Sequence, residues 1–393
     1  MIFTMMALCF GDVVNNPEAT GSKSIIFEEV LRFGAIEPGD EYLWFDSTVP
    51  ANLDVNQKGE IYVLDPKGKR VLHFTEKGEF VDVLVKAGEG PGEANNPTFF
   101  QLMERGAMVS EPRGASVKFT FFDNDYAYES VYESMDLSKL VARASFSPKG
   151  TVAFGLVMEI DTTGGPSFFK SAILDREFNV IEYLSSTEWP IPDPSRFGDP
   201  SYWSELIGKQ MNGLMNQGNQ QVAFYADGSL LINYPHKYQI DERAADGKTL
   251  VKSINKAYKP IAMKQSDTDG LGQWLQDTIF EQAPQLAQIV NDQTIKKALE
   301  LADLPEVKPP VYFIIPIENL GFLALREVNF ADESFNADLF LRDGTCIGHV
   351  DSPSDGLADL FGPRMVFKNG KAYTMMHNED GDNEVVVYNY EIR

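Results

Sequence analysis

Residues Ala51 to Val85 read ANLDVNQKGEIYVLDPKGKRVLHFTEKGEFVDVLV, and this stretch decides the fold. It contains four short runs rich in β-branched and aromatic residues, separated by turns at Lys58-Gly59, Pro66-Lys67-Gly68 and Glu76-Lys77-Gly78. Glycine adopts the positive φ of tight hairpin turns at little cost, so the pattern predicts a four-stranded antiparallel meander. One meander cannot bury both of its faces, and we therefore expect it to recur.

The pattern does recur along the rest of the chain. Every copy has a glycine between its first two strands, and these are Gly59, Gly106, Gly150, Gly228, Gly321 and Gly370. Three of the intervals match the roughly 40–50 residues of a propeller blade, and the two longer ones contain inserts. The sixth copy ends after its third strand, at Arg393, whereas Ser24–Phe33 is a spare strand. We therefore predict an all-β, six-bladed β-propeller of four-stranded antiparallel blades, with the N-terminal strand closing the last blade.

Two inserts interrupt the repeat. Residues 201–216 and 267–303 have apolar residues at helical spacing, and the second of these helical regions lies in a longer insert over 264–308. We expect the second insert to be a packing element on the propeller, with a lid over a ligand as the alternative. The predicted organisation is a single propeller over 24–393, preceded by a segment over 1–23 that is either a disordered terminus or the remnant of a signal peptide.

The same residues carry a family resemblance. Gly59–Asp65, the Gly88–Glu93 linker and the Asp227–Leu230 turn resemble NHL-type repeats, and the helical insert leading to Leu304–Pro310 fits the same pattern. The chain is similar to the bacterial six-bladed NHL-like propellers, which are usually exported and mostly have no assigned function. The resemblance therefore implies the fold and an extracytoplasmic location, but it does not imply an activity.

Composition restricts the classes of partner. The 393 residues include 34 Lys and Arg against 58 Asp and Glu, giving a net charge of −24. Such acidity argues against nucleic acids and anionic membrane surfaces. Two cysteines cannot build a disulfide framework or a metal knuckle, and no run of about 18 apolar residues predicts a membrane span. We expect a monomer.

The first residues leave the location open. Ile2–Phe10 is apolar enough for a signal-peptide core, yet no Lys or Arg precedes Lys23. Met6–Cys9 resembles a lipoprotein box, although Leu8 fits it poorly. A start codon assigned too late would explain the missing positively charged region. A periplasmic or otherwise extracytoplasmic protein, a lipoprotein and a cytoplasmic protein are the alternatives.

Polar side chains are expected where the second strands end. If these ends share one rim of the propeller, they form a mixed-charge pocket in which Arg113 and Arg326 clamp a carboxylate or phosphate. The alternative is an internal collar of salt bridges between blades. The candidate ligand-binding residues are Arg113, Arg326, Tyr234, His236, His377 and Asp65.

The sequence does not settle whether the protein is an enzyme. Some NHL-type propellers are zinc lyases, but zinc catalysis needs about three protein ligands, and only His236 and His377 are expected to share a rim. We therefore predict no cofactor, with zinc at these histidines or calcium at the acidic run 378–384 as alternatives. The expected function is a scaffold that binds a protein, a peptide or a small anionic ligand. The alternative is a metal-assisted lyase or hydrolase acting at the channel mouth.

Overall fold

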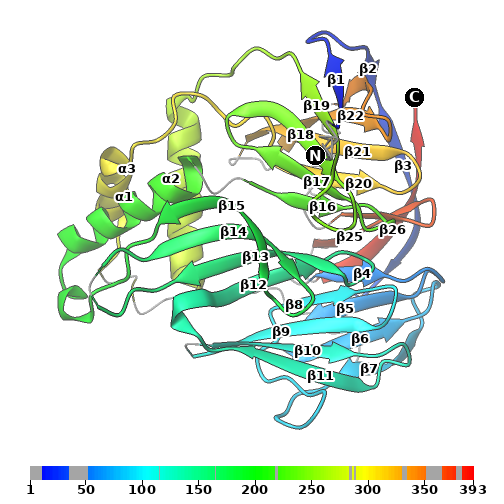
Figure 1. Ribbon diagram of the computed structural model, residues 1–393, viewed down its shortest axis with the longest axis horizontal. Coiled ribbons are helices and arrows are strands. Elements are labelled where there is room, and N and C mark those ends of the chain that lie inside the picture. Colours follow the sequence, from blue (N-terminus) through cyan, green and yellow to red (C-terminus); the bar gives the residue numbers. More distant parts are fainter. Residues whose placement is uncertain are drawn as a thin grey trace, which may run out of the picture.

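The described strands form three four-stranded antiparallel sheets, consistent with propeller blades, together with one five-stranded and one nine-stranded sheet (Figure 1). In the computed structural model, neighbouring strands of the three four-stranded sheets are also consecutive in the chain, whereas the five-stranded and nine-stranded sheets also contain strands from the N-terminal segment. The structure describes residues 11–34, 52–114, 116–163, 165–216, 220–282, 286, 289–329, 334–350, 365–377 and 383–393.

The first three sheets are simple meanders, which we number units 1 to 3. Unit 1 contains β4 (Leu53–Val55), β5 (Ile61–Asp65), β6 (Arg70–Phe74) and β7 (Phe80–Val85). Unit 2 contains β8 (Phe99–Leu102), β9 (Ala107–Arg113), β10 (Ser116–Phe122) and β11 (Tyr128–Ser134). Unit 3 contains β12 (Leu140–Phe146), β13 (Val152–Glu159), β14 (Phe168–Asp175) and β15 (Val180–Glu188).

The remaining sheets recruit strands from the N-terminus. Unit 4 contains β16 (Val222–Phe224), β17 (Leu230–Tyr234), β18 (Lys237–Arg243) and β19 (Leu250–Lys256), with β1 (Asp12–Asn16) on its outer edge. Unit 5 contains β20 (Phe313–Ile317), β21 (Gly321–Asn329), β22 (Ser334–Leu341) and β23 (Cys346–Val350), with β2 (Ser22–Lys23) outside. Unit 6 contains β24 (Val366–Lys368), β25 (Lys371–His377), β26 (Asn383–Ile392) and β3 (Ile25–Phe33). Units 5 and 6 form one nine-stranded sheet through the parallel pair Ile317 and Phe367.

The turn glycines behave almost as the sequence predicts. Five of the six, among them Gly59 at φ +84° and Gly106 at φ +89°, have the left-handed conformation. Gly321 does not, because Asn319 takes the positive φ of its turn. A Cβ atom at Gly321 would lie only 1.9 Å from the backbone oxygen of Phe340, so this position needs glycine for close approach of the two strands.

Each sheet buries both of its faces against neighbouring sheets. In β5, Ile61 and Val63 pack toward unit 6, whereas Tyr62 and Leu64 pack toward unit 2. This alternation is the period-two facing of a strand whose two sides are both covered. Apolar clusters likewise join units 2 and 3, 3 and 4, 4 and 5, and 5 and 6. The stacking therefore passes through all six units and returns to the first.

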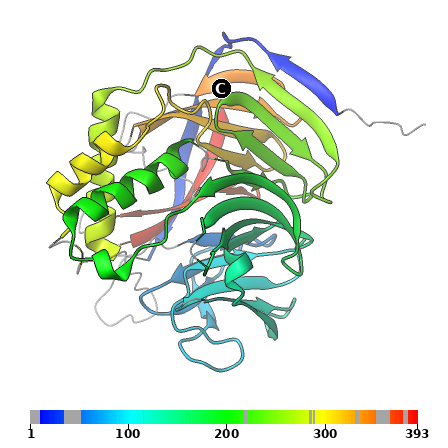
Figure 2. The same cartoon turned by 60° about the vertical axis from the view of Figure 1, so that its left-hand side comes forward.

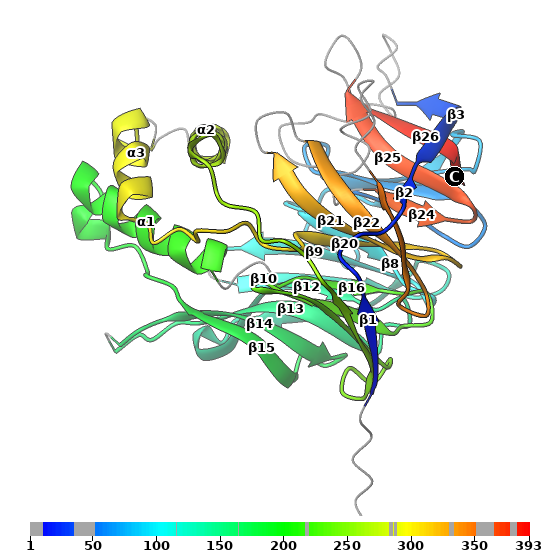
Figure 3. The same ribbon diagram turned by 90° about the horizontal axis from the view of Figure 1, so that it is seen from above.

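The helical inserts form a separate layer at one end of the sheets (Figure 3). The predicted helix over 201–216 is confirmed as α1 (Pro200–Asn216), and the insert contains α2 (Gln265–Gln282) and α3 (Asp292–Leu301). The three helices share one apolar cluster centred on side chains such as Trp203 and Ile295. An ion pair of 2.6 Å between Lys308 and Asp267 ties the two ends of the insert together. Among the described residues, no helix is long and apolar enough to cross a membrane.

The N-terminal segment runs along the outer edges of units 4, 5 and 6 (Figure 2). The predicted N-terminal strand does pair with the last sheet, since β3 pairs antiparallel with β26 from Ile25 with Ile392 to Phe33 with Val385. Part of the segment over 1–23 is also ordered: β1 pairs in parallel with β19, and β2 pairs in parallel with β23. The amide side chain of Asn16 lies between two units. It donates to the carbonyls of Asn255 and Gly344 and accepts from the backbone N–H of Cys346 at 2.7 Å.

Replacing Asn16 with alanine tests how firmly this segment is held. The Asn16 side chain is buried, so Asn16→Ala leaves the Cys346 N–H without its acceptor. We expect the free energy of unfolding, measured by urea denaturation, to fall by about 1–3 kcal/mol.

The neighbouring Asn15 is a matched control. Its side chain accepts one long contact of 3.4 Å from Asn255 at the exposed surface, and Asn15→Ala should change the free energy of unfolding by less than about 0.5 kcal/mol. Equal losses in the two variants would show that the segment does not join units 4 and 5.

Candidate functional site

The residues predicted at the ends of the second strands mostly bind other residues of the protein. Asp65, at the end of β5, is buried and accepts from Arg70 Nε at 2.8 Å and from the backbone N–H of Gly68. Tyr234, at the end of β17, donates its hydroxyl to Asp241 at 2.6 Å. His236 follows in an exposed turn, and His377 is the last residue of β25, its side chain outside the described part of the structure.

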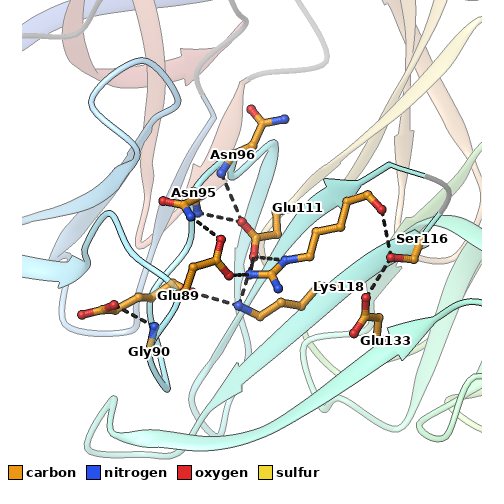
Figure 4. Close-up of polar contacts among 10 residues, drawn as sticks. Glu89, Gly90, Asn95, Asn96, Glu111, Ser116, Lys118 and Glu133 are labelled. Carbon is orange, nitrogen blue, oxygen red and sulfur yellow. Dashed lines mark hydrogen bonds and ion pairs between the residues drawn. The ribbon is translucent and has the colours of Figure 1, made fainter.

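Arg113 belongs to a network around the buried carboxylate of Glu111 (Figure 4). One Glu111 oxygen accepts from Arg113 Nε at 3.0 Å and contacts Lys118 Nζ at 3.0 Å. The other oxygen accepts from the backbone N–H groups of Asn95 and Asn96. Burial alone would raise the pKa of Glu111, but these hydrogen bonds and the Lys118 charge together hold it below its usual value. The carboxylate is therefore ionised and fully engaged by its neighbours.

This network fastens the linker between units 1 and 2. Lys118 also donates to the carbonyl of Glu93, and Arg113 pairs with the exposed carboxylate of Glu89. The linker residues 88–96 are thereby held against β9 and β10. In the described structure Arg113 thus forms ion pairs with Glu89 and Glu111.

Arg326 takes part in a second buried network, between units 4 and 5. Its guanidinium lies 3.3 Å from the carboxylate of Asp338, which is only 1% exposed. Tyr238 donates its hydroxyl to the same carboxylate, and Lys256 and His349 approach it at 3.6 and 3.3 Å. Burial would raise the pKa of Asp338, yet the hydrogen bonds from His349 and Tyr238 and the charges of Arg326 and Lys256 hold it below its usual value.

A large cavity opens at the opposite ends of the second strands. It has a volume of about 1030 Å³ and is lined by the innermost strands and by the turns that precede each second strand. Every unit contributes to it, as the lining residues Lys58, Arg105, Pro148, Asp227, Glu318 and Lys368 show. None of the predicted site residues whose side chains are described lines this cavity.

Around the cavity, side chains form hydrogen bonds to the backbone of the innermost strand of the neighbouring unit. The carboxamide of Asn52 pairs with both the N–H and the carbonyl of Phe100, and that of Gln101 pairs with both backbone groups of Phe146. Asp54 accepts from the N–H of Leu102 at 2.8 Å. Paired donors and acceptors of this kind fix adjacent strands in register, so the cavity has a preformed wall.

The acidic groups of the cavity mostly have internal partners. Burial raises the pKa of Asp54, and the charge of Lys368 and two backbone N–H donors offset only part of that effect. Asp227 forms an ion pair of 2.7 Å with Arg342, whose guanidinium stacks over the ring of Tyr225. Glu318 accepts from the backbone N–H of Asn369 at 2.6 Å.

The histidines lie in different units and have different surroundings. His73 stacks on Tyr62 with ring centroids 4.3 Å apart and contacts Asp82 at 3.1 Å. His349 contacts Asp338, and His236 lies in its exposed turn. The described residues contain no group of three or more His, Cys, Asp or Glu that could hold a metal ion. Most of the acidic run 378–384, the candidate calcium loop, lies outside the described residues.

Comparison with known proteins gives only distant structural similarity. No protein-family model matches the chain, and a search of curated proteins finds no significant match. A "putative exported protein" from Bacteroides fragilis has 9% identity and a TM-score of 0.49, with 97% of this chain and 99% of that chain covered. A member of the DUF4221 family from Bacteroides vulgatus has 10% identity and a TM-score of 0.48, covering 95% and 99%. Virginiamycin B lyase from Staphylococcus aureus has 9% identity and a TM-score of 0.33, covering 92% and 88%.

Sequence reasoning missed the cavity residues because it searched the other ends of the second strands. A signal for them was present in the turns that it had already identified. The residue before the turn glycine is basic in three consecutive copies, at Lys58, Arg105 and Lys149. In a chain with net charge −24, that repetition marks one end of the repeat as chemically distinct.

Removing the Asp338 carboxylate tests the network around Arg326. Asp338→Asn leaves Lys256 and Arg326 without their shared carboxylate, and we expect it to lower the free energy of unfolding at pH 7 by about 3–5 kcal/mol. Because the folded-state pKa of Asp338 is lowered, its stabilisation is present above the usual Asp pKa and is lost as pH falls below about 4. The difference between wild type and variant should therefore shrink in urea denaturations below that pH.

Asp125→Asn serves as the control, since Asp125 is exposed in a turn. Its stability should match that of the wild type within about 0.5 kcal/mol. A variant at Asp338 that is as stable as the wild type at pH 7 would contradict a stabilising role for this carboxylate.

Proposed function

We propose that the six units close into a six-bladed β-propeller that works as a binding scaffold, with its ligand in the axial cavity. The cycle of apolar clusters supports closure, because the contacts between units 6 and 1 complete it. The motif around Gly59–Asp65 and the Gly88–Glu93 linker supports assignment to the NHL-like propellers. A location outside the cytoplasm is part of the proposal and rests on that resemblance.

The observation that carries the binding function is the cavity to which all six units contribute. Binding sites are typically concave, largely preformed and lined by apolar surface with a few convergent polar groups. Here Leu102, Phe224 and Ile317 supply apolar surface, while Asp54 and Lys368 supply charge. The hydrogen bonds from Asn52 and Gln101 to the backbone hold the cavity wall in place without a ligand. Binding should therefore cost little conformational entropy.

A bulky side chain inside the cavity should abolish binding. Ser145 lines the cavity from β12, and Ser145→Trp would occupy part of the volume. We expect a library of neutral, cationic, zwitterionic and anionic small molecules to yield compounds that raise the melting temperature of the wild type. These shifts should disappear in Ser145→Trp.

Ser130→Trp is the matched control, because Ser130 is exposed on the outer strand β11. It should keep the shifts seen with the wild type. Compounds that stabilise wild type and Ser145→Trp equally would place their site elsewhere, and a library without any stabilising compound would count against a small-molecule site in the cavity.

A further inference from the structure

Three basic side chains occupy equivalent positions in consecutive units around the cavity mouth. Lys58, Arg105 and Lys149 each precede a turn glycine with positive φ, at Gly59, Gly106 and Gly150. The turns of units 1 and 3 close with the same type of backbone hydrogen bond: Gly59 donates to Asn56, and Gly150 donates to Ser147. Equivalent turns present the preceding side chain in equivalent directions, so the three cations form an arc over units 1 to 3.

The three cations of the arc are open to solvent. Lys58, Arg105 and Lys149 are exposed, and within the described part of the chain none of their side chains forms a hydrogen bond or an ion pair. Lys58 and Arg105 line the cavity directly, and Lys149 lies against the turn at Gly228 on the same rim. Lys368 of unit 6 continues the arc deeper inside, where it donates to the carbonyl of Val55.

Unlike the three cations, the acidic side chains around the cavity mostly have hydrogen-bond or ion-pair partners within the protein. Asp227 is paired with Arg342 and Glu318 accepts a backbone N–H, and both belong to units 4 and 5. Glu60 accepts from the side chain of Asn56, and Asp54 accepts from two backbone N–H groups. Glu104 is the exposed acid of the lining without a side-chain partner among the described residues. The hydrogen bonds leave the negative charges of Glu60 and Glu318 in place, but they hold these carboxylates against the protein. On the rim of units 1 to 3, the exposed charged side chains at the three turns are the cations Lys58, Arg105 and Lys149 and the acid Glu104.

We infer that the cavity takes a ligand with two or more anionic groups, which the arc of Lys58, Arg105 and Lys149 holds at the mouth. This inference rests on the proposed binding function and adds the chemical class of the ligand. Carboxylates or phosphates spaced along a chain suit three separated cations better than a single compact charge does. The surrounding protein is strongly acidic, so a local arc of cations also selects where such a ligand docks.

Isothermal titration calorimetry of the full chain with three probe compounds tests whether the protein binds a ligand with several anionic groups. Trigalacturonate carries spaced carboxylates, tripolyphosphate carries phosphates, and maltotriose is a neutral sugar of similar size. We expect at least one of the two anions to bind and maltotriose not to bind. Raising the salt from 20 to 200 mM should weaken the anion measurably, because exposed charges are screened. The relative affinities of the two anions identify the carboxylate or phosphate class.

Charge-reversing substitutions distinguish the effect of the three cations of the arc from the effect of the protein's overall net charge. The triple variant Lys58→Glu, Arg105→Glu, Lys149→Glu should weaken anion binding at least tenfold. A second triple variant, Lys209→Glu, Lys237→Glu, Lys296→Glu, has the same net charge, but its substitutions lie on exposed positions in α1, β18 and α3. It should change the affinity by less than about twofold.

The experiments distinguish failure of the proposed anionic ligand from failure of the proposed binding function. Equal weakening in both triple variants, or no binding of either anion, would overturn the anionic ligand. If a neutral or cationic compound from the small-molecule library binds wild type but not Ser145→Trp, the binding function stands while the ligand class is wrong. If an anion binds and Ser145→Trp does not weaken it, the arc acts on its own and the cavity is not the site.

Discussion

Every four-stranded sheet in this protein depends on having a neighbour on each face. Apolar side chains alternate along β5 so that adjacent residues face different units, and all five residues of that strand are buried. Such a strand has no face that water could cover without exposing large apolar surface. The first sheet is therefore satisfied only when the last has packed against it, and stability belongs to the whole cycle rather than to any one unit.

Because each sheet packs on both faces, most residues that hold the sheets together are not available to bind a ligand. Most side chains between units are apolar, and those that hydrogen-bond to the innermost strands, such as Asn52 and Gln101, are already occupied by backbone contacts. The buried charges at Glu111 and Asp338 are likewise surrounded by donors from the protein itself. Some turn residues around the cavity also join units, as Asn369 does with Glu318, but the exposed side chain of Arg105 has no such contact among the described residues. Residues such as Arg105 can therefore vary in charge without disturbing the sheets, and in our proposal the protein uses them for specificity.

The sequence predicted the sheets well because their signals are local. Turn glycines such as Gly59 and Gly228 mark hairpins, and the missing last strand pointed directly to Ser24–Phe33. It did not predict β1, since the short run Asp12–Asn16 has no apolar pattern and owes its place to pairing with β19. The candidate site was harder. In the sequence, a charged residue at a strand end, such as Arg113, looks the same whether it binds a ligand or another residue such as Glu111. Only the three-dimensional structure shows which group lies next to it.

The path of the N-terminal segment restricts the order in which the chain can become native. Asn16 bonds to Cys346 across 330 positions, and Arg32 bonds to Glu384 across 352. Residues of this segment therefore cannot reach their native partners until residues 346 to 384 are also present and in place. Contacts of such long range make for slow folding, since the entropy of closing the chain is lost before the contacts form. A chain of this design stays open until its distant segments meet, and in that open state it is vulnerable to proteases.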